Sequence, residues 1–201
     1  STHASVNHGG PEMVVYRATP PDITSGARVG NVEYIGYPAS GAGAASDPAL
    51  RIAFFALLHE QTVSDRIAVF ARDEAGNEAT ASFVDNVFEK PFKKSRIEID
   101  DKFLQRVVPE ILEHSPELKL ATPGEGDLVP AFLKINGELR RLNAERFGEM
   151  TRASSSSRLW SGPFVQLGNS QVEAGFADHR TYLRSGQEID QQTHLGFDLA
   201  V

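Results

Sequence analysis

The chain has 201 residues, of which 40% are hydrophobic and 23% are charged, a balance typical of a globular protein of one or two domains. This composition excludes a mainly disordered chain. The net charge of −7 argues against nucleic acid as a partner, because a phosphate-binding groove needs a basic surface. The sequence contains no cysteine, which excludes disulfides and thiolate zinc ligands.

No run of about 18 apolar residues occurs, so the sequence predicts no membrane-spanning helix. The first residue is Ser1 rather than methionine. We therefore expect that an upstream segment was removed, by a signal peptidase or when the chain was prepared. Membrane contact is expected only through an anchor in such an N-terminal segment.

The first half of the chain is predicted to be a β domain. Residues 1–10 are polar and end in two glycines, which predicts a flexible tail. Residues 11–92 hold short β-prone runs between turn signals, which predicts an antiparallel β-sandwich. The apolar run at 51–59 predicts a central strand, and the alternating run at 66–72 predicts another. The Gly-Asn pair that follows predicts a hairpin at 75–77.

One part of this region is similar to a known family. The run Arg-Ile-Ala-Val-Phe-Ala-Arg-Asp-Glu-Ala-Gly-Asn-Glu-Ala lies at 66–79 and resembles the last hairpin of bacterial immunoglobulin-like domains. The resemblance implies an immunoglobulin-like domain over 11–92. Such domains are spacers or docking surfaces, so this likeness alone implies no chemistry.

Residues 93–158 are predicted to form a helical segment and a linker. After a strand at 95–99, either Asp100 or Asp101 can cap a helix. Apolar residues then recur at helical spacing, but Pro109 interrupts them, which predicts a kink or two short helices.

A second helix follows, and helices are expected to cover about 101–147. Its apolar residues recur every three or four positions, at Leu128, Phe132, Ile135, Leu139 and Leu142. Four consecutive serines at 154–157 then predict an exposed, flexible joint.

Residues 159–201 are β-like again, and their end carries the candidate site. Polar and apolar residues alternate there, which places His194, Gly196 and Asp198 on one face of a strand. The residues of the other face are predicted to pack in a core: Leu195, Phe197 and Leu199. An imidazole and a carboxylate can both bind zinc, but in a straight strand their Cα atoms would lie about 13 Å apart. A bend at Gly196 would shorten this distance. From spacing alone, both a zinc site and a plain His–Asp pair remain open.

Longer motifs point to a family. The His-x-Gly-x-Asp motif at 194–198 is preceded by Phe-Ala-Asp-His-Arg-Thr-Tyr at 176–182. Farther upstream, at 160–172, lies the run Trp-Ser-Gly-Pro-Phe-Val-Gln-Leu-Gly-Asn-Ser-Gln-Val. Together they resemble the opening of the catalytic domain of peptidase family M23, the LytM/lysostaphin-type zinc endopeptidases. The likeness is to exported members that carry an immunoglobulin-like segment and helices before the peptidase domain.

The resemblance implies a mainly β fold with helices (α+β), in which an immunoglobulin-like β-sandwich, a helical segment and the start of an M23-type β-sheet domain at 159–201 follow one another. It implies a zinc-dependent endopeptidase that cleaves peptide cross-links or stems of peptidoglycan in the bacterial periplasm or cell envelope. One Zn²⁺ would be bound per complete catalytic domain, with His194 and Asp198 as its first two ligands. Arg180 and Tyr182 would bind substrate.

The sequence departs from the family pattern in one respect. The family takes its third zinc ligand from a downstream His-x-His motif, whose other histidine assists the attacking water together with an upstream histidine. The sequence holds no His-x-His, and His179 does not match the third ligand because it precedes His194. The resemblance therefore predicts that the catalytic residues lie downstream of Val201, in a C-terminal part of the peptidase domain that this chain needs as a partner. The 201 residues alone are then expected to be inactive.

Two alternatives remain open. One is a non-catalytic regulator of cell-wall hydrolases, and the other is a β-sandwich binding module. The presence of both His194 and Asp198 favours the enzyme, because a degenerate site would have little reason to keep them.

Overall fold

The structure is a computed structural model that describes residues 4–43, 46–84, 86–119 and 126–201. Its fold is mainly β with helices, which confirms the predicted α+β class at this level. The chain divides into two compact units: unit 1 comprises Ser1–Pro91 and Ser155–Val165, and unit 2 comprises Phe92–Ser154 and Gln166–Val201. The segment 155–165 thus belongs with unit 1, so the predicted boundary at 158/159 does not coincide with the division of the structure. No helix of the described residues is long and apolar enough to cross a membrane.

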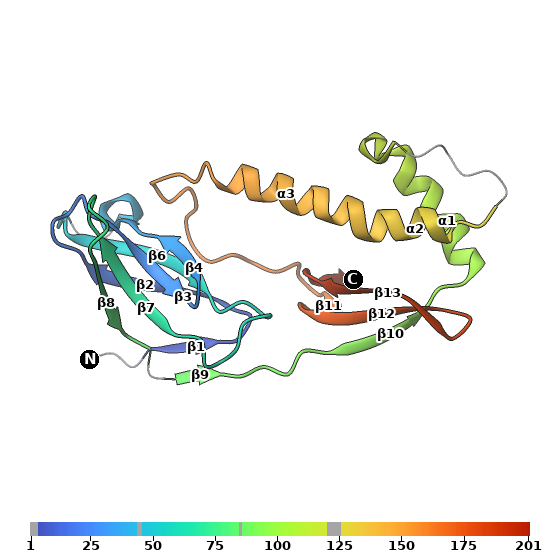
Figure 1. Ribbon diagram of the computed structural model, residues 1–201, viewed down its shortest axis with the longest axis horizontal. Helices are drawn as coiled ribbons and strands as arrows, with labels where there is room; N and C mark the ends of the chain where they lie inside the picture. Colours follow the sequence, from blue (N-terminus) through green and yellow to red (C-terminus); the bar gives the residue numbers. More distant parts are fainter. Residues whose placement is uncertain (1–3, 44–45, 85, 120–125) are drawn as a thin grey trace. The chain divides into compact units, whose positions relative to one another are not determined.

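Unit 1 is built around two antiparallel sheets (Figure 1). The three-stranded sheet has the order β2-β6-β5, formed by β2 (Pro11–Arg17), β6 (Leu50–Ala56) and β5 (Tyr37–Pro38). The four-stranded sheet has the order β4-β3-β7-β8, formed by β4 (Val32–Ile35), β3 (Thr24–Val29), β7 (Ile67–Arg72) and β8 (Glu78–Ser82). A short 3-10 helix, η1 (Ala39–Ala42), follows β5. Strands β6 and β7 confirm the strands predicted at 51–59 and 66–72.

The predicted hairpin at 75–77 is confirmed as the turn between β7 and β8. Gly76 has φ +86°, a backbone conformation that glycine adopts without steric cost. The carboxylate of Asp73 accepts hydrogen bonds from the backbone and side-chain nitrogens of Asn77, which closes the turn.

Apolar residues of both sheets share one core. Val14, Ala53 and Phe55 come from the three-stranded sheet, and Ala27, Val29 and Ile67 come from the four-stranded sheet. The mainly apolar sequence of β6 suits this position, because the strand is central in its sheet and most of its side chains are covered.

The predicted flexible tail at 1–10 is wrong for the described residues 4–10. β1 (Ser5–Asn7) pairs in parallel with β9 (Asn86–Phe88), and the side chain of Val6 belongs to the core of unit 1. Polar neighbours surround this single apolar residue in the sequence. Its burial depends on a strand eighty residues downstream, so local composition gave no signal for it.

Unit 2 places helices against a sheet. The sheet has the order β10-β12-β13, formed by β10 (Lys94–Glu98), β12 (Asp178–Arg184) and β13 (Gln187–His194). A separate two-stranded sheet pairs β11 (Gln171–Ala174) with β14 (Asp198–Ala200). The helices are α1 (Asp101–Glu113), α2 (Val129–Lys134) and α3 (Arg140–Thr151). A 3-10 turn, η2 (Pro116–Leu118), follows α1, and a π-helical turn, η3 (Ile135–Leu139), lies between α2 and α3. They confirm the helices expected over 101–147; residues 120–125 of that range lie outside the described residues.

Helix α1 begins as predicted, but Pro109 does not divide it. The carboxylate of Asp100 caps the helix by accepting a hydrogen bond from the backbone nitrogen of Phe103 at 2.7 Å. The helix then runs through Pro109 as one element, because Leu104 and Val108 anchor it in the core of unit 2. The alternative of two short helices is therefore wrong.

The core of unit 2 lies between the helices and one face of the sheet. Phe132 of α2 packs against Tyr182 of β12 and Phe103 of α1, with ring centroids 5.7 and 6.3 Å away. Ile135 and Leu139 of the π-helical turn join the same cluster. This packing fixes β12, from which the candidate site is built.

Candidate functional site

His194 and Asp198 lie at the ends of two different strands. β13 ends at His194 and β14 begins at Asp198, so the single strand predicted through both residues is wrong. The chain leaves one sheet and enters another across the intervening three residues. This change of direction brings His194 Nε2 to 3.4 Å from Asp198 Oδ1. A bend at this connection, which Gly196 permits, replaces the straight strand and brings the two side chains together.

The two side chains fit the donor arrangement of half a zinc site. Ligands bound at about 2.0–2.2 Å to a tetrahedral ion lie about 3.3–3.6 Å from one another. The separation of His194 Nε2 and Asp198 Oδ1 falls in this range. In addition, Nε2 is buried and has no hydrogen-bond partner among the described residues. Nitrogen of imidazole and oxygen of carboxylate are both ordinary zinc ligands.

The part of the chain that the structure describes provides no third metal ligand beside His194 and Asp198. There, no group of three or more His, Cys, Asp or Glu side chains is close enough to hold a metal ion. His179 points to a different partner, since its Nδ1 lies 3.2 Å from the hydroxyl of Thr193. The described residues thus provide two ligands, whereas catalytic zinc takes three from the protein.

Arg180 lies between two carboxylates. Its Nε is 3.4 Å from Asp178 Oδ2, and its Nη2 is 3.5 Å from Asp198 Oδ2. Burial alone would lower the pKa of the guanidinium, but hydrogen bonding to the Tyr182 hydroxyl and to Asp178 outweighs it, so the pKa of Arg180 is raised. Arg180 therefore carries a permanent positive charge beside the candidate metal ligand.

Asp178 is a site residue that the sequence analysis did not single out. It is 3% exposed and lies opposite His194 in the register of β12 and β13. Its Oδ2 accepts a hydrogen bond from the hydroxyl of Ser95 at 2.8 Å, whereas its Oδ1 is buried without a hydrogen-bond partner among the described residues. The signal for it in the sequence is the alternation of Asp178, Arg180 and Tyr182, which places all three side chains on one face of β12.

Arg180 and Tyr182, the predicted substrate-binding residues, line a pocket of about 390 Å³ in unit 2. Side chains of α1, α2, the π-helical turn and α3 complete its wall, which is mainly apolar. Tyr182 is only 6% exposed, because its ring packs against Phe132. Substrate contact by these two residues stays a prediction.

The apolar neighbours of the site are not packed as expected. Leu195 and Phe197 are 63% and 60% exposed, which contradicts the prediction that they lie in a core. Both belong to the connection between β13 and β14 rather than to a strand, so the alternation that placed them on a covered face does not apply.

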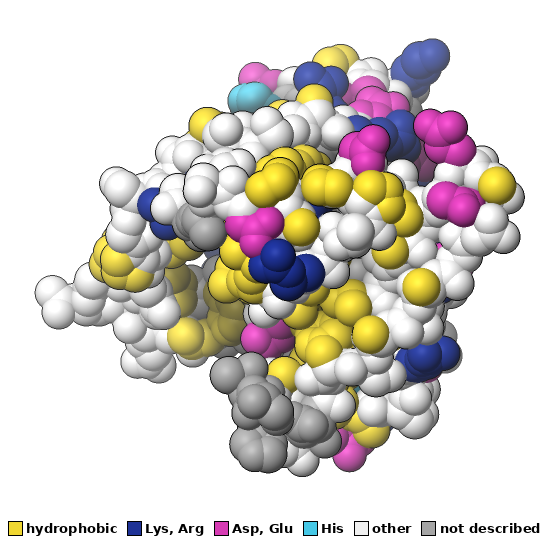
Figure 2. Space-filling view, turned by 90° about the vertical axis from the view of Figure 1, so that its left-hand side faces the viewer, with side chains coloured by type: hydrophobic (Ala, Val, Ile, Leu, Met, Phe, Trp, Pro, Cys, Tyr) yellow, Lys and Arg dark blue, Asp and Glu magenta, His cyan; other side chains and the backbone are white. Residues whose placement is uncertain are grey.

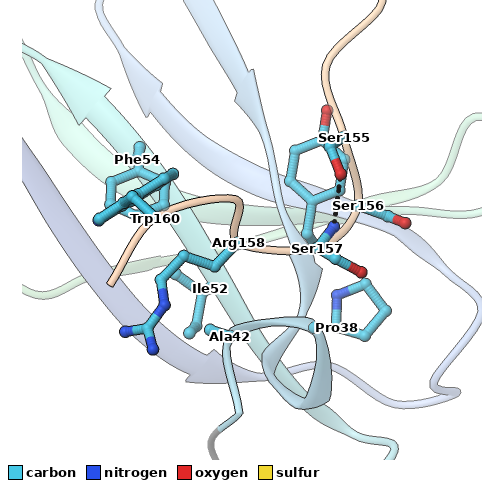
Figure 3. A pocket seen from close by; sticks show the side chains of 11 residues that line it. Pro38, Ala42, Ile52, Phe54, Ser155, Ser156, Ser157, Arg158 and Trp160 are labelled. Atoms are coloured by element: carbon cyan, nitrogen blue, oxygen red, sulfur yellow. Dashed lines mark hydrogen bonds between the residues drawn. The ribbon is translucent and has the colours of Figure 1, made fainter. Parts of the chain in front are cut away.

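A second concave site lies within unit 1. The segment 155–165 packs on η1 and on the three-stranded sheet. The backbone nitrogen of Arg158 donates to the carbonyl of Gly41 in η1 at 3.0 Å. The ring of Trp160 lies 6.3 Å from that of Phe54 and 5.6 Å from that of Phe164. Figure 3 shows the pocket enclosed between this segment, β6 and η1.

Exposed apolar groups continue beyond this pocket. Figure 2 shows hydrophobic side chains gathered across one face of the molecule. On the three-stranded sheet, Met13 is 54% and Phe54 is 55% exposed, and the two residues are paired across β2 and β6. Contiguous exposed apolar surface of this kind is typical of interaction sites.

No protein-family model matches the chain, and no curated protein sequence matches it.

Proposed function

We propose that the chain is part of a zinc-dependent endopeptidase of the M23 type, which cleaves peptide cross-links or stems of peptidoglycan in the bacterial periplasm or cell envelope. The observation that carries the proposal is the pairing of His194 Nε2 with Asp198 Oδ1 at the distance of two ligands on one tetrahedral ion. The burial of Nε2 supports it, because this nitrogen makes no hydrogen bond among the described residues although Asp198 Oδ1 lies 3.4 Å away, and a buried nitrogen without a hydrogen bond is costly.

In this proposal His194 would hold the metal through the lone pair on Nε2, and Asp198 would hold it through Oδ1. Zinc at such a site lowers the pKa of a bound water and polarises a carbonyl group. The carboxylate of Asp198 offsets part of the metal charge, while Arg180 contacts its other oxygen. The third ligand and the two assisting histidines are assigned to a C-terminal part of the peptidase domain outside the 201 residues.

Unit 1 is proposed to be an immunoglobulin-like accessory module. Two antiparallel sheets that share one core support this assignment, as does the hairpin between β7 and β8. A module of this kind places or docks the catalytic part and carries no chemistry of its own.

The pocket of unit 1 supports a second candidate function, that of a non-catalytic wall-binding protein. Phe54 and Trp160 line an apolar depression that a ligand or partner could fill, and Phe164 packs beside Trp160. The two functions differ in their dependence on His194, because wall binding through unit 1 needs Trp160 and not the imidazole.

The proposal is tested by peptidoglycan digestion with protein that includes residues beyond Val201. The expected result is release of soluble peptides that a chelator stops and added zinc restores, with His194→Ala and Asp198→Ala both inactive. His114→Ala is the matched control, because His114 is exposed at the end of α1 and its replacement should leave digestion unchanged. Digestion by His194→Ala at the normal rate would overturn the proposal. Wall binding without digestion, lost in Trp160→Ala, would establish the non-catalytic function instead.

A further inference from the structure

Among the described residues, Asp178 is the one buried carboxylate near the candidate metal site, and the proposed chemistry does not use it directly. Its side chain is 4% exposed, whereas the side chain of Asp198 is 56% exposed. Burying a carboxylate is unfavourable unless charges or hydrogen bonds compensate it. A role for this group therefore has to explain why β12 places it directly opposite His194.

A continuous series of contacts leads from Asp178 to the candidate ligand. Ser95 donates to Asp178 Oδ2, and the same oxygen lies 3.4 Å from Arg180 Nε. Arg180 then extends its Nη2 to within 3.5 Å of Asp198 Oδ2. The remaining oxygen of Asp198, Oδ1, is the atom that lies 3.4 Å from His194 Nε2.

The two ends of this series differ in how firmly their strands are held by neighbouring strands. β12 is the central strand of its sheet and is paired with β10 and β13 along its length. β14, which carries Asp198, has three residues and, among the described strands, pairs with β11 alone. The Asp198 side chain would rotate freely on such a strand without a partner that holds it, and freedom of this kind weakens metal binding.

We infer that Asp178 and Arg180 are positioning residues that orient the Asp198 carboxylate, so that Oδ1 faces the metal and Oδ2 faces the guanidinium. The inference rests on the proposed zinc site and adds to it the residues that fix one ligand. Arg180 suits this role because its planar guanidinium offers two donors in fixed directions, one for each carboxylate. Asp178 holds the guanidinium in place and neutralises its charge inside the sheet.

The first experiment measures the orientation of Asp198 in the metal-free 201-residue chain. Three-bond scalar couplings about χ1 of Asp198 report whether its side chain occupies one rotamer or several. We expect one dominant rotamer in the wild type and averaged couplings in Arg180→Gln. Asp178→Asn, which keeps the shape of the side chain and removes its charge, should average them as well. Arg184→Gln is the matched control, because Arg184 lies on the same strand and pairs with Asp101, away from the site.

The second experiment measures zinc affinity by calorimetric titration in the same variants and in His194→Ala. Loss of residues that orient a metal ligand lowers affinity by about 10–100-fold, which is the decrease expected for Arg180→Gln. Arg180→Lys should restore only part of it, because an ammonium group cannot bridge both carboxylates in the same geometry. Affinity should be unchanged in Arg184→Gln.

The outcomes separate the inference from the function on which it rests. If His194→Ala leaves zinc affinity unchanged, the proposed zinc site is wrong. If His194→Ala abolishes binding while Arg180→Gln changes neither the affinity nor the χ1 couplings of Asp198, the zinc site stands and the positioning role is overturned.

Discussion

At the scale of single residues, four charged side chains on the four-stranded sheet of unit 1 form a compact network. Arg28 contacts Glu33 and Glu78, each at 2.6 Å, and Arg72 contacts the same two carboxylates at 2.9 and 3.5 Å. Both guanidinium groups lie over the ring of Phe70, at 4.9 and 5.4 Å from its centroid. Hydrogen bonds from Arg72 and Arg28 lower the pKa of Glu33, and those from Arg28 lower the pKa of Glu78.

This network predicts an acid-sensitive unit 1. A carboxylate whose pKa is lowered by folding stabilises the fold above its ordinary value of 4.5 and loses this contribution as the pH falls through the lowered value. Replacing Arg28 by Gln should therefore flatten the dependence of stability on pH below about 4.5. Urea unfolding followed by the fluorescence of Trp160, the only tryptophan, measures this because its ring contacts Phe54 in unit 1.

Arg66→Gln is the control for that measurement. Arg66 lies just before β7 and donates to the hydroxyl of Thr80, not to a carboxylate. Its replacement should leave the steepness of the pH dependence unchanged. An equally steep acid transition in wild type and Arg28→Gln would show that the network does not cause it.

At the scale of elements, the second predicted helix contains a π-helical turn that its spacing did not indicate. Asn136, within that turn, is 4% exposed; its Nδ2 donates to Asp190 Oδ2 at 2.6 Å, and its Oδ1 accepts from Arg140 Nε at 2.9 Å. The extra residue of a π turn shifts the helix face, which allows a polar side chain to face the sheet between the apolar Ile135 and Leu139.

We expect Asn136→Ala to lower the free energy of unfolding of unit 2 by about 1–3 kcal/mol, because it removes the hydrogen bonds that this buried side chain makes with Asp190 and Arg140. Asn143→Ala, on the exposed side of α3, should change stability by less than about 0.5 kcal/mol. Chemical unfolding followed by circular dichroism compares the two variants. Equal effects would mean that the hydrogen bonds of Asn136 contribute nothing to the fold.

The serine-rich joint is also an element whose role the structure defines. Residues 154–157 are exposed, as predicted, and their flexibility stays a prediction. However, a Cβ atom added at Gly41 would lie 2.2 Å from the carbonyl oxygen of Ser156, so the joint rests closely on η1. The absence of a side chain at Gly41 is thus required by this close approach.

Gly41→Ala should displace the joint from unit 1 and increase its cleavage. The added methyl group cannot share space with the Ser156 carbonyl, so either the segment or η1 must move. We expect limited proteolysis at 154–158 to be several-fold faster in Gly41→Ala than in Ser40→Ala, the exposed neighbour that serves as control. Equal cleavage rates would contradict the packing of the segment on unit 1.

At the scale of the whole molecule, the sequence predicted the elements whose pattern is local. The strands β6 and β7, their hairpin and the helix that begins at Asp100 all follow from periodicity, turn residues and capping over ten to fifteen positions. The strand β1 could not be predicted from such local patterns, since Val6 is buried through the pairing of β1 with β9. The alternation after Thr193 predicted one strand, but the connection between two sheets interrupts it.

The same distinction holds for the candidate site. The closeness of the His194 and Asp198 side chains could be anticipated because the two residues share a short motif with a glycine that permits a bend, and their binding of zinc stays a prediction. Asp178 was harder to find, because its alternation with Arg180 and Tyr182 is a weak signal and its hydrogen bond comes from Ser95, eighty-three residues away in the sequence. Local patterns thus reveal residues that are close in the sequence, whereas contacts between distant strands do not show in them.

The central claim is that His194 and Asp198 bind one zinc ion together. Anomalous diffraction at the zinc absorption edge from crystals of the 201-residue chain soaked in zinc tests it most directly. The account predicts an anomalous peak at about 2.0–2.2 Å from both His194 Nε2 and Asp198 Oδ1. Peaks at other histidines with none between these two atoms would contradict it.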